Sequence, residues 1–153
     1  MENEKTQYPF QINDQYVKDL SFENPNYLLK YSDEYKQPEV GVSIENNVAK
    51  IDDEHYEVTL NISAKSSVED KTIFIVELAY SALVTVAKNL EADVLEPILL
   101  VHCPFLMFPF IREVVAKVTS AGGFPPLLLD PIDFASLYVS KKKELSEQKS
   151  KAN

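Results

Sequence analysis

Residue types that carry catalysis are scarce in this chain and poorly spaced for it. His102 and Cys103 form the only adjacent pair of a potential base and a potential nucleophile. Sequence neighbours rarely face each other productively, and a Cys–His dyad is normally assembled from separate elements. We therefore expect both side chains to be buried in the core, and we predict that the protein is not an enzyme. A small enzyme that uses this pair stays open as an alternative.

Metal and nucleotide sites also lack their usual sequence patterns. A structural zinc site needs four ligands at matched spacing, which His55, His102 and Cys103 do not supply. The acidic run at 52–54 lacks the ligand spacing and the glycine of a calcium loop. With three glycines and no G-x-x-x-x-G-K-[ST] motif, the chain offers no phosphate-binding loop. We predict no catalytic residue, no metal and no cofactor.

Apolar side chains instead gather in two segments where a surface loop would be polar. Residues 124–129 read FPPLLL between two predicted helices, and residues 23–39 form a long stretch without periodicity. Apolar loops of this kind either close a core or present a surface that binds apolar partners. From these segments and the helix that follows, the side chains that could line one aromatic groove are Tyr27, Leu28, Leu29, Tyr31, Tyr35, Phe124, Leu127, Leu129, Phe134 and Tyr138. From the residues alone, groove and core stay equally open.

Composition indicates one globular domain in a reducing compartment. With 153 residues, 45% of them hydrophobic, the chain can bury roughly two-thirds of its unfolded surface. One cysteine cannot form an intramolecular disulfide. The polar amino terminus lacks a signal-peptide pattern, and the most apolar run, 98–111, is interrupted by His102, Pro104 and Pro109. Because this run is shorter than a membrane span, we expect a cytoplasmic protein that does not insert into a membrane.

Charge is distributed unevenly along the chain. Residues 141–153 hold five lysines and two glutamates, a balance of +3. The preceding 140 residues hold ten basic and 22 acidic side chains, a balance of −12. An acidic body repels nucleic acid and anionic membranes at long range and attracts basic partners, although the same acidity would also serve solubility alone. We expect no nucleic-acid partner.

Hydrophobic periodicity predicts an α+β fold in which four antiparallel strands precede the helices. The strands are expected at 10–22, 40–44, 56–64 and 72–80, and the alternation of apolar and polar residues is clearest in the third. The turn signals are Asn46-Asn47 and the polar stretch 66–71. Residues 81–97 fit either an extension of the fourth strand or a helix.

Two helices are expected on the carboxyl side of the strands. The first has an apolar face at helical spacing from Phe108 onward and should end at Gly122-Gly123, since glycine takes the left-handed conformation at little cost. Asp130 is expected to cap the second helix, with Pro131 in its first turn.

The motif F-P-(aromatic)-x-R-E at 108–113, followed by G-x-F-P-x-L-x-L-x-P-(Ile/Val)-(Asp/Asn)-F-x-x-L at 122–137, resembles the bacterial protein-export chaperone family SecB. Further matches follow in order along the chain: FQINDQYVKDLSFENPN at 10–26, QPEV at 37–40, YEVTL at 56–60 and TIFIVEL at 72–78. Each piece is weakly specific. The ordered set covers residues 10–140 and identifies the chain as SecB-like.

This resemblance implies a four-stranded antiparallel sheet with two carboxyl-terminal helices packed on one side, assembled as a dimer of dimers. It implies one chaperone domain at 9–140, between a flexible tail at 1–8 and a flexible lysine-rich tail at 141–153. Such a protein would be an ATP-independent holdase that keeps unfolded secretory precursors in the cytoplasm and delivers them to the translocation ATPase SecA. A generic α+β ligand-binding or adaptor domain remains the alternative.

The resemblance also implies where the binding sites lie. In the SecB family the crossover loop and the second helix border the client groove, which favours the groove interpretation for the apolar residues named above. A flat acidic surface docks SecA in the family. The positions that match it here are Asp19, Glu23, Ile75 and Glu77.

Overall fold

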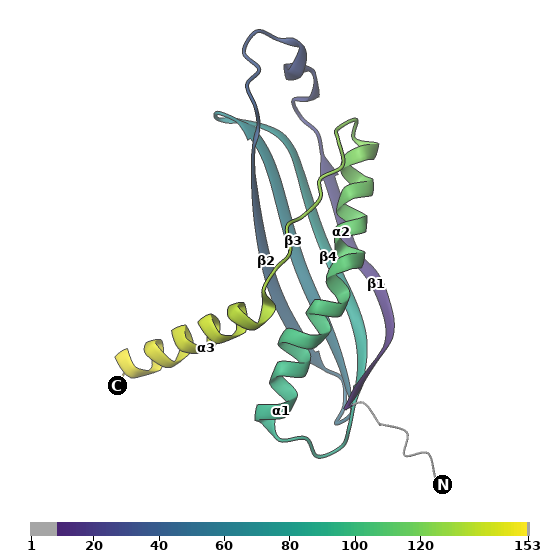
Figure 1. Cartoon of the computed structure of the whole chain (residues 1–153), viewed down its shortest axis with the longest axis vertical. Helices are drawn as coiled ribbons and strands as arrows, with labels where there is room; N and C mark the ends of the chain where they lie inside the picture. The colour runs from purple at the N-terminus through teal and green to yellow at the C-terminus, as the bar shows by residue number, and fades with distance from the viewer. Residues whose placement is uncertain (1–8, 153) are drawn as a thin grey trace.

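The computed structural model describes residues 9–152, which form a four-stranded antiparallel sheet followed by helices (Figure 1). The strands are β1 (Phe10–Glu23), β2 (Glu39–Lys50), β3 (His55–Val68) and β4 (Lys71–Val86), in the sheet order β1-β4-β3-β2. A 3₁₀ turn, η1 (Tyr27–Tyr31), lies in the crossover between β1 and β2. The predicted α+β fold with an antiparallel sheet is confirmed.

The strands are longer than the sequence predicted. Asn46 and Asn47 do not form a turn, because they pair with Leu60 and Thr59 inside β2, and the chain reverses instead at residues 51–54. β3 likewise runs to Val68, through the first half of the expected 66–71 turn. Of the ambiguous stretch 81–97, residues 81–86 extend β4. Pairing with a long neighbouring strand has outweighed the local turn preference of asparagine.

One continuous helix follows the sheet and crosses its face (Figure 1). It comprises α1 (Ala92–Pro97), a π-helical turn η2 (Ile98–His102) and α2 (Cys103–Ala121). Pro104 and Pro109 lack the amide that would bond to the preceding turn, yet the helix continues through both, with the wider π turn directly before Pro104. At 30 residues the helix is long and apolar enough to cross a membrane, so the length argument made from the sequence is wrong. Core helices meet the same criterion, and this one packs on the sheet.

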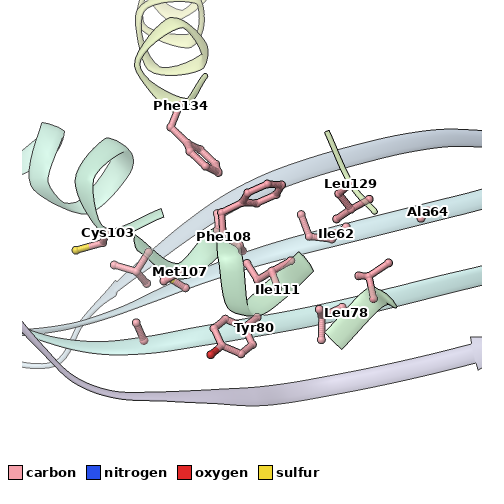
Figure 2. Packing of buried hydrophobic residues seen from close by; sticks show 14 of the residues in the cluster. Ile62, Ala64, Leu78, Tyr80, Cys103, Met107, Phe108, Ile111, Leu129 and Phe134 are labelled. Atoms are coloured by element: carbon pink, nitrogen blue, oxygen red, sulfur yellow. The ribbon is translucent and has the colours of Figure 1, made fainter. Parts of the chain in front are cut away.

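The hydrophobic core lies between this helix and one face of the sheet (Figure 2). The buried side chains of α2 recur at intervals of three and four residues and so lie on one face of the helix. The sheet contributes every second side chain of β3 and β4 to the same core. The fully buried side chains include Leu60, Ile62, Val76, Met107 and Ile111. Each stabilises the fold by about 1.5–3 kcal/mol through burial of its apolar surface.

The connector after α2 returns across the same face of the sheet, and two partly buried hydrogen bonds hold it there. Leu127 donates its amide to the Thr119 hydroxyl at 2.9 Å, and Arg112 Nε donates to the Leu129 carbonyl at 2.9 Å. Gly123 is the glycine with a positive φ, +90°, whereas Gly122 keeps a helical conformation.

The last helix, α3 (Phe134–Lys151), is capped by Asp133 and not by Asp130. The Asp133 carboxylate accepts the Ser136 amide at 3.0 Å, so the cap falls three residues later than predicted. Pro131 therefore precedes the helix. Beyond Phe134, which is in the core, α3 points away from the sheet (Figure 1).

The structure describes one of the two tails that were expected from the sequence. Residues 141–151 are helical, in continuation of α3, where a flexible tail was expected. The tail at 1–8 lies outside the described residues, and the domain bounds 9–140 stay a prediction. Of the two helices expected to pack on one side, the helix that contains α2 does so along its length, and α3 does so only at its beginning.

Candidate functional site

His102 and Cys103 lie in different surroundings, although they are neighbours in sequence. Cys103 is fully buried in the core, and this burial raises the pKa of its thiol to about 12. His102 is exposed, and its ring stacks on Phe10 with 6.4 Å between ring centroids. The expectation of burial is thus confirmed for Cys103 and wrong for His102. In residues 9–152, no three His, Cys, Asp or Glu side chains lie close enough to hold a metal ion.

The four acidic-surface positions taken from the sequence lie together on the sheet face opposite the helix. Glu77 of β4 pairs with Ser21 of β1. Two residues away on either side along β4, Ile75 pairs with Glu23 and Ala79 pairs with Asp19. A two-residue period puts Asp19, Glu23, Ile75 and Glu77 on one face, while Leu78 and Val76 point into the core. We call this the acidic sheet face.

Sequence reasoning missed a fourth acid on the acidic sheet face, Glu45. A shallow hollow of about 480 Å³ is lined by Asp19, Glu45 and Glu77 with serine and asparagine side chains between them. Glu45 follows the alternation of β2, so the signal was the strand pairing, which a single sequence does not give. Among residues 9–152, no lysine or arginine lines this hollow.

Glu57, in contrast, is a glutamate of this sheet whose negative charge is compensated by neighbouring side chains. Glu57 binds Lys18 Nζ at 2.6 Å and accepts the Tyr16 hydroxyl. Lys18 and then Tyr16 hold the pKa of Glu57 below its usual value, and the same hydrogen bond raises the pKa of Tyr16 to about 12. Among the described residues, no such ion pair involves the three acids of the hollow. Their negative charge is therefore left to attract a basic partner.

The predicted groove residues fall into two separate places. At the first, the crossover and the connector meet in an aromatic cluster: the Tyr27 and Phe124 rings are 5.3 Å apart and edge-on, and Phe124 lies 4.9 Å from Phe74. Asn26 fixes this end of the crossover by donating to the Thr72 carbonyl at 2.7 Å.

Around this aromatic cluster, burial divides the predicted residues. Leu29 and Leu127 pack against the core, and Leu129 is buried in it. Leu28 and Tyr31 are 74% and 76% exposed, and Tyr35 is also exposed. The crossover therefore presents three large apolar side chains to solvent beside a rigid aromatic base.

The second place is a cleft where α3 leaves the body. It has a volume of about 710 Å³ and an apolar lining that includes Ile44, Leu60, Leu100, Phe134, Leu137 and Leu145. Phe134 forms part of its floor and stacks edge-on against Phe108, with 5.9 Å between centroids (Figure 2). Tyr138 is in its wall and donates its hydroxyl to Glu96 at 2.7 Å. We call this the α3 cleft.

The sequence identified only two members of the α3 cleft, Phe134 and Tyr138. Leu137 and Leu145 stand at helical spacing from them, so the signal was present but was cut off by ending the helix near residue 140. The members from β2, β3 and the end of α1 are brought in by tertiary structure and have no local signal.

Two further apolar surfaces remain uncovered in the single chain. On the solvent side of α2, Phe105 is 67% exposed, with Leu106 and Phe110 beside it. β1 is an edge strand that exposes Val17 and Leu20. Exposed apolar rows and unpaired strand edges of this length are typical of surfaces that other chains cover.

The sequence of this chain is similar to those of known protein-export proteins. A family model described as "Preprotein translocase subunit SecB" matches residues 3–145. Proteins named "Protein-export protein SecB" from Afipia carboxidovorans and Paramagnetospirillum magneticum are 44% and 41% identical to this chain. The alignments cover 88% of this chain and 83% of the first relative, and 93% and 91% for the second.

A solved structure also shares the fold. It is a SecB-like chaperone from Mycobacterium tuberculosis in complex with a ChAD peptide from the HigA1 antitoxin. The TM-score is 0.68, over 81% of this chain and 91% of that chain, at 16% sequence identity. Similarity at this level of identity shows the common fold.

Proposed function

This chain belongs to the SecB family of protein-export chaperones, and from that premise we propose that it holds unfolded secretory precursors in the cytoplasm and delivers them to SecA without using ATP. The α3 cleft is the main support, because it is an apolar, open site of a size that accepts several side chains of an extended polypeptide. The exposed crossover side chains Leu28, Tyr31 and Tyr35 extend the available apolar contact area.

Binding alone is sufficient for such a function. A partner that binds the unfolded state and not the folded state opposes folding by mass action, without any chemical step. A client segment that buries about 500 Å² of apolar surface gains roughly 12 kcal/mol before costs, at about 25 cal/mol/Å². Ordering of the client and loss of its translational freedom cancel much of this gain. Individual sites should be weak, and several sites on one particle would supply avidity.

Client binding is tested by refolding a slowly folding precursor with and without this protein, in the absence of nucleotide. We expect the refolding rate to fall as the chaperone concentration rises, and addition of ATP to leave the rate unchanged. A refolding rate that does not respond to the protein would contradict the proposal.

We propose the acidic sheet face as the docking surface for SecA. Asp19 and Glu77 flank a hollow that no basic side chain of the described part of the chain lines, so a partner with a basic surface would be attracted there. Ile75 adds an apolar contact and Glu23 a further charge on the same face. The α3 cleft, which we propose for clients, is lined from the other face of the sheet, so clients and SecA would not compete for one surface.

Substitution Glu77→Lys tests this assignment. We expect SecA affinity to fall by about tenfold at low salt, because reversal of a charge in an interface replaces attraction with repulsion. Client binding should not change. Asp53→Lys, in the turn between β2 and β3, makes the same change in net charge away from the surface and should leave SecA affinity intact. If wild type and Glu77→Lys bind SecA with equal affinity, the acidic sheet face is not the docking surface for SecA.

We further propose a tetramer built as a dimer of dimers. Two different uncovered surfaces support it: the edge of β1 with Val17 and Leu20, and the solvent side of α2 with Phe105 and Phe110. Two self-complementary surfaces on one chain generate a closed assembly of four copies.

A further inference from the structure

On the premise that the acidic sheet face docks SecA as proposed above, we propose that Glu57 is a positioning residue, which holds Lys18 away from Asp19 and so keeps this face acidic. Lys18 directly precedes Asp19 in β1. Its ammonium group would compensate the charge of Asp19 if it turned toward that carboxylate. Instead it binds Glu57 of β3, with 2.6 Å between Lys18 Nζ and Glu57 Oε1.

A β-bulge brings the Lys18 and Asp19 side chains to the same face of the sheet. Along a regular strand, neighbouring side chains point to opposite faces. In β1, however, the register places Val17 opposite Tyr80 and Asp19 opposite Ala79, so Lys18 is an extra residue without a partner in β4. The side chain of this extra residue binds a glutamate of the outer face, and both charges of the dipeptide therefore lie on the acidic sheet face.

Glu57 is well placed to retain Lys18. Its strand neighbours Tyr56 and Val58 are in the core, so Glu57 points outward. Its side chain is only 22% exposed, and its second oxygen, Oε2, accepts the Tyr16 hydroxyl. Because each carboxylate oxygen has its own donor, the carboxylate is fixed in orientation. The ion pair with Lys18 is therefore held more firmly than a pair between two fully exposed side chains.

A released Lys18 would act directly on the docking surface. The lysine side chain is a compact charge on a flexible stem, and Asp19 is the acid of the hollow that is nearest to it along the chain. An ion pair between the two would remove one negative charge from the surface and place a cation where a basic partner binds.

The net charge of the protein gives a different expectation. If only long-range attraction mattered, neutralising Glu57 would weaken SecA binding as much as neutralising any other glutamate, and independently of Asp19. A positioning role instead predicts that the effect of Glu57 depends on both Lys18 and Asp19. Double-mutant cycles separate the two expectations, because they measure how far two substitutions depart from additivity.

The test measures SecA affinity of the full-length protein at low salt, with Asp19→Asn introduced into different backgrounds. In wild type we expect Asp19→Asn to lower the affinity by about fivefold, because it removes one charge of the docking surface. In Glu57→Gln the same substitution should lower the affinity by less than about twofold, because Lys18 already compensates Asp19 there. K18Q/E57Q removes the lysine as well, and should restore both the affinity of wild type and the full effect of Asp19→Asn.

Glu39→Gln is the matched control, since it makes the same change in net charge at the first residue of β2. In this background Asp19→Asn should keep its full effect. If Asp19→Asn has the same effect in Glu57→Gln as in wild type, the positioning role is wrong and SecA docking stands. Failure of K18Q/E57Q to restore the affinity would show that Glu57 does not act through Lys18, which also overturns the role. If neither Asp19→Asn nor Glu77→Lys weakens SecA binding by wild type, the docking surface and this inference both fall.

Discussion

Cys103 is the residue at which an enzyme and a binding protein are most easily told apart. Its side chain is fully buried, and the pKa of its thiol is raised to about 12 by loss of hydration. At pH 8 the reactive thiolate is therefore nearly absent in the folded protein, whereas an ordinary thiol with a pKa of about 8.5 is partly ionised. The raised pKa and the burial both lower reactivity.

We predict that iodoacetamide at pH 8 leaves Cys103 of the native protein unmodified for a period that fully alkylates the urea-unfolded chain. Mass spectrometry of the intact protein measures both. Client binding by the treated native protein should equal that of untreated protein. Rapid native alkylation with loss of function would return the Cys–His enzyme to consideration.

At the scale of elements, Gly123 joins α2 to the connector and sets how closely the crossover approaches. It has a φ of +90°, and an added Cβ would lie 2.7 Å from the Tyr27 hydroxyl. We predict that Gly123→Ala lowers the free energy of unfolding by about 1–3 kcal/mol, because it adds backbone strain and pushes Tyr27 off the aromatic cluster.

Urea denaturation measures this change, and Gly41→Ala is the matched control. Gly41 lies in β2 with no atom within 4 Å of an added Cβ and without a left-handed backbone. The control should not lower the free energy of unfolding and is expected to raise it by up to about 1 kcal/mol, because alanine has less conformational freedom to lose on folding. A Gly123→Ala protein as stable as wild type would show that the close contact with Tyr27 does not contribute to stability.

Local patterns predicted the elements where burial alternates, and failed where long-range pairing decides. The alternation of apolar residues through Leu60 and Ile62 predicted β3 correctly, because one face of this strand is buried. Asn46 was read as a turn because its partner Leu60 is invisible in a local window. Asp130 and Asp133 are both residue types that cap helices, and local sequence does not decide between them, whereas in the structure Asp133 is the cap.

The candidate site was predictable only in part, for a related reason. The acidic face followed from the resemblance and from alternation along β4, but Glu45 needed the strand order. The apolar residues of the crossover, the connector and the last helix were taken as one groove because the family resemblance implies that the crossover loop and the second helix border it. In the structure the aromatic cluster around Phe124 and the α3 cleft at Phe134 are separate, because the connector between them spans the sheet.

For the whole molecule, we propose the exposed side of α2 as an interface between chains, because it presents large apolar side chains to solvent. Phe105 and Phe110 are exposed on a helix whose other side is in the core. We predict that Phe105→Asp with Phe110→Asp reduces the native mass from four chains of 17.4 kDa to two, because buried carboxylates would disrupt an apolar interface.

Sedimentation equilibrium measures this mass. Leu28→Asp changes an equally exposed apolar residue in the crossover and should leave the tetramer intact. A tetramer that survives the double substitution would exclude this side of α2 as an interface.

The central claim is that this protein is an oligomeric holdase that captures unfolded precursors by binding alone. Native mass by light scattering, measured without nucleotide before and after addition of an unfolded precursor, tests it most directly. We expect a particle of about 70 kDa, which corresponds to four chains of 17.4 kDa. Its mass should increase by that of the bound precursor. A monomer whose mass does not change when the precursor is added would contradict the account.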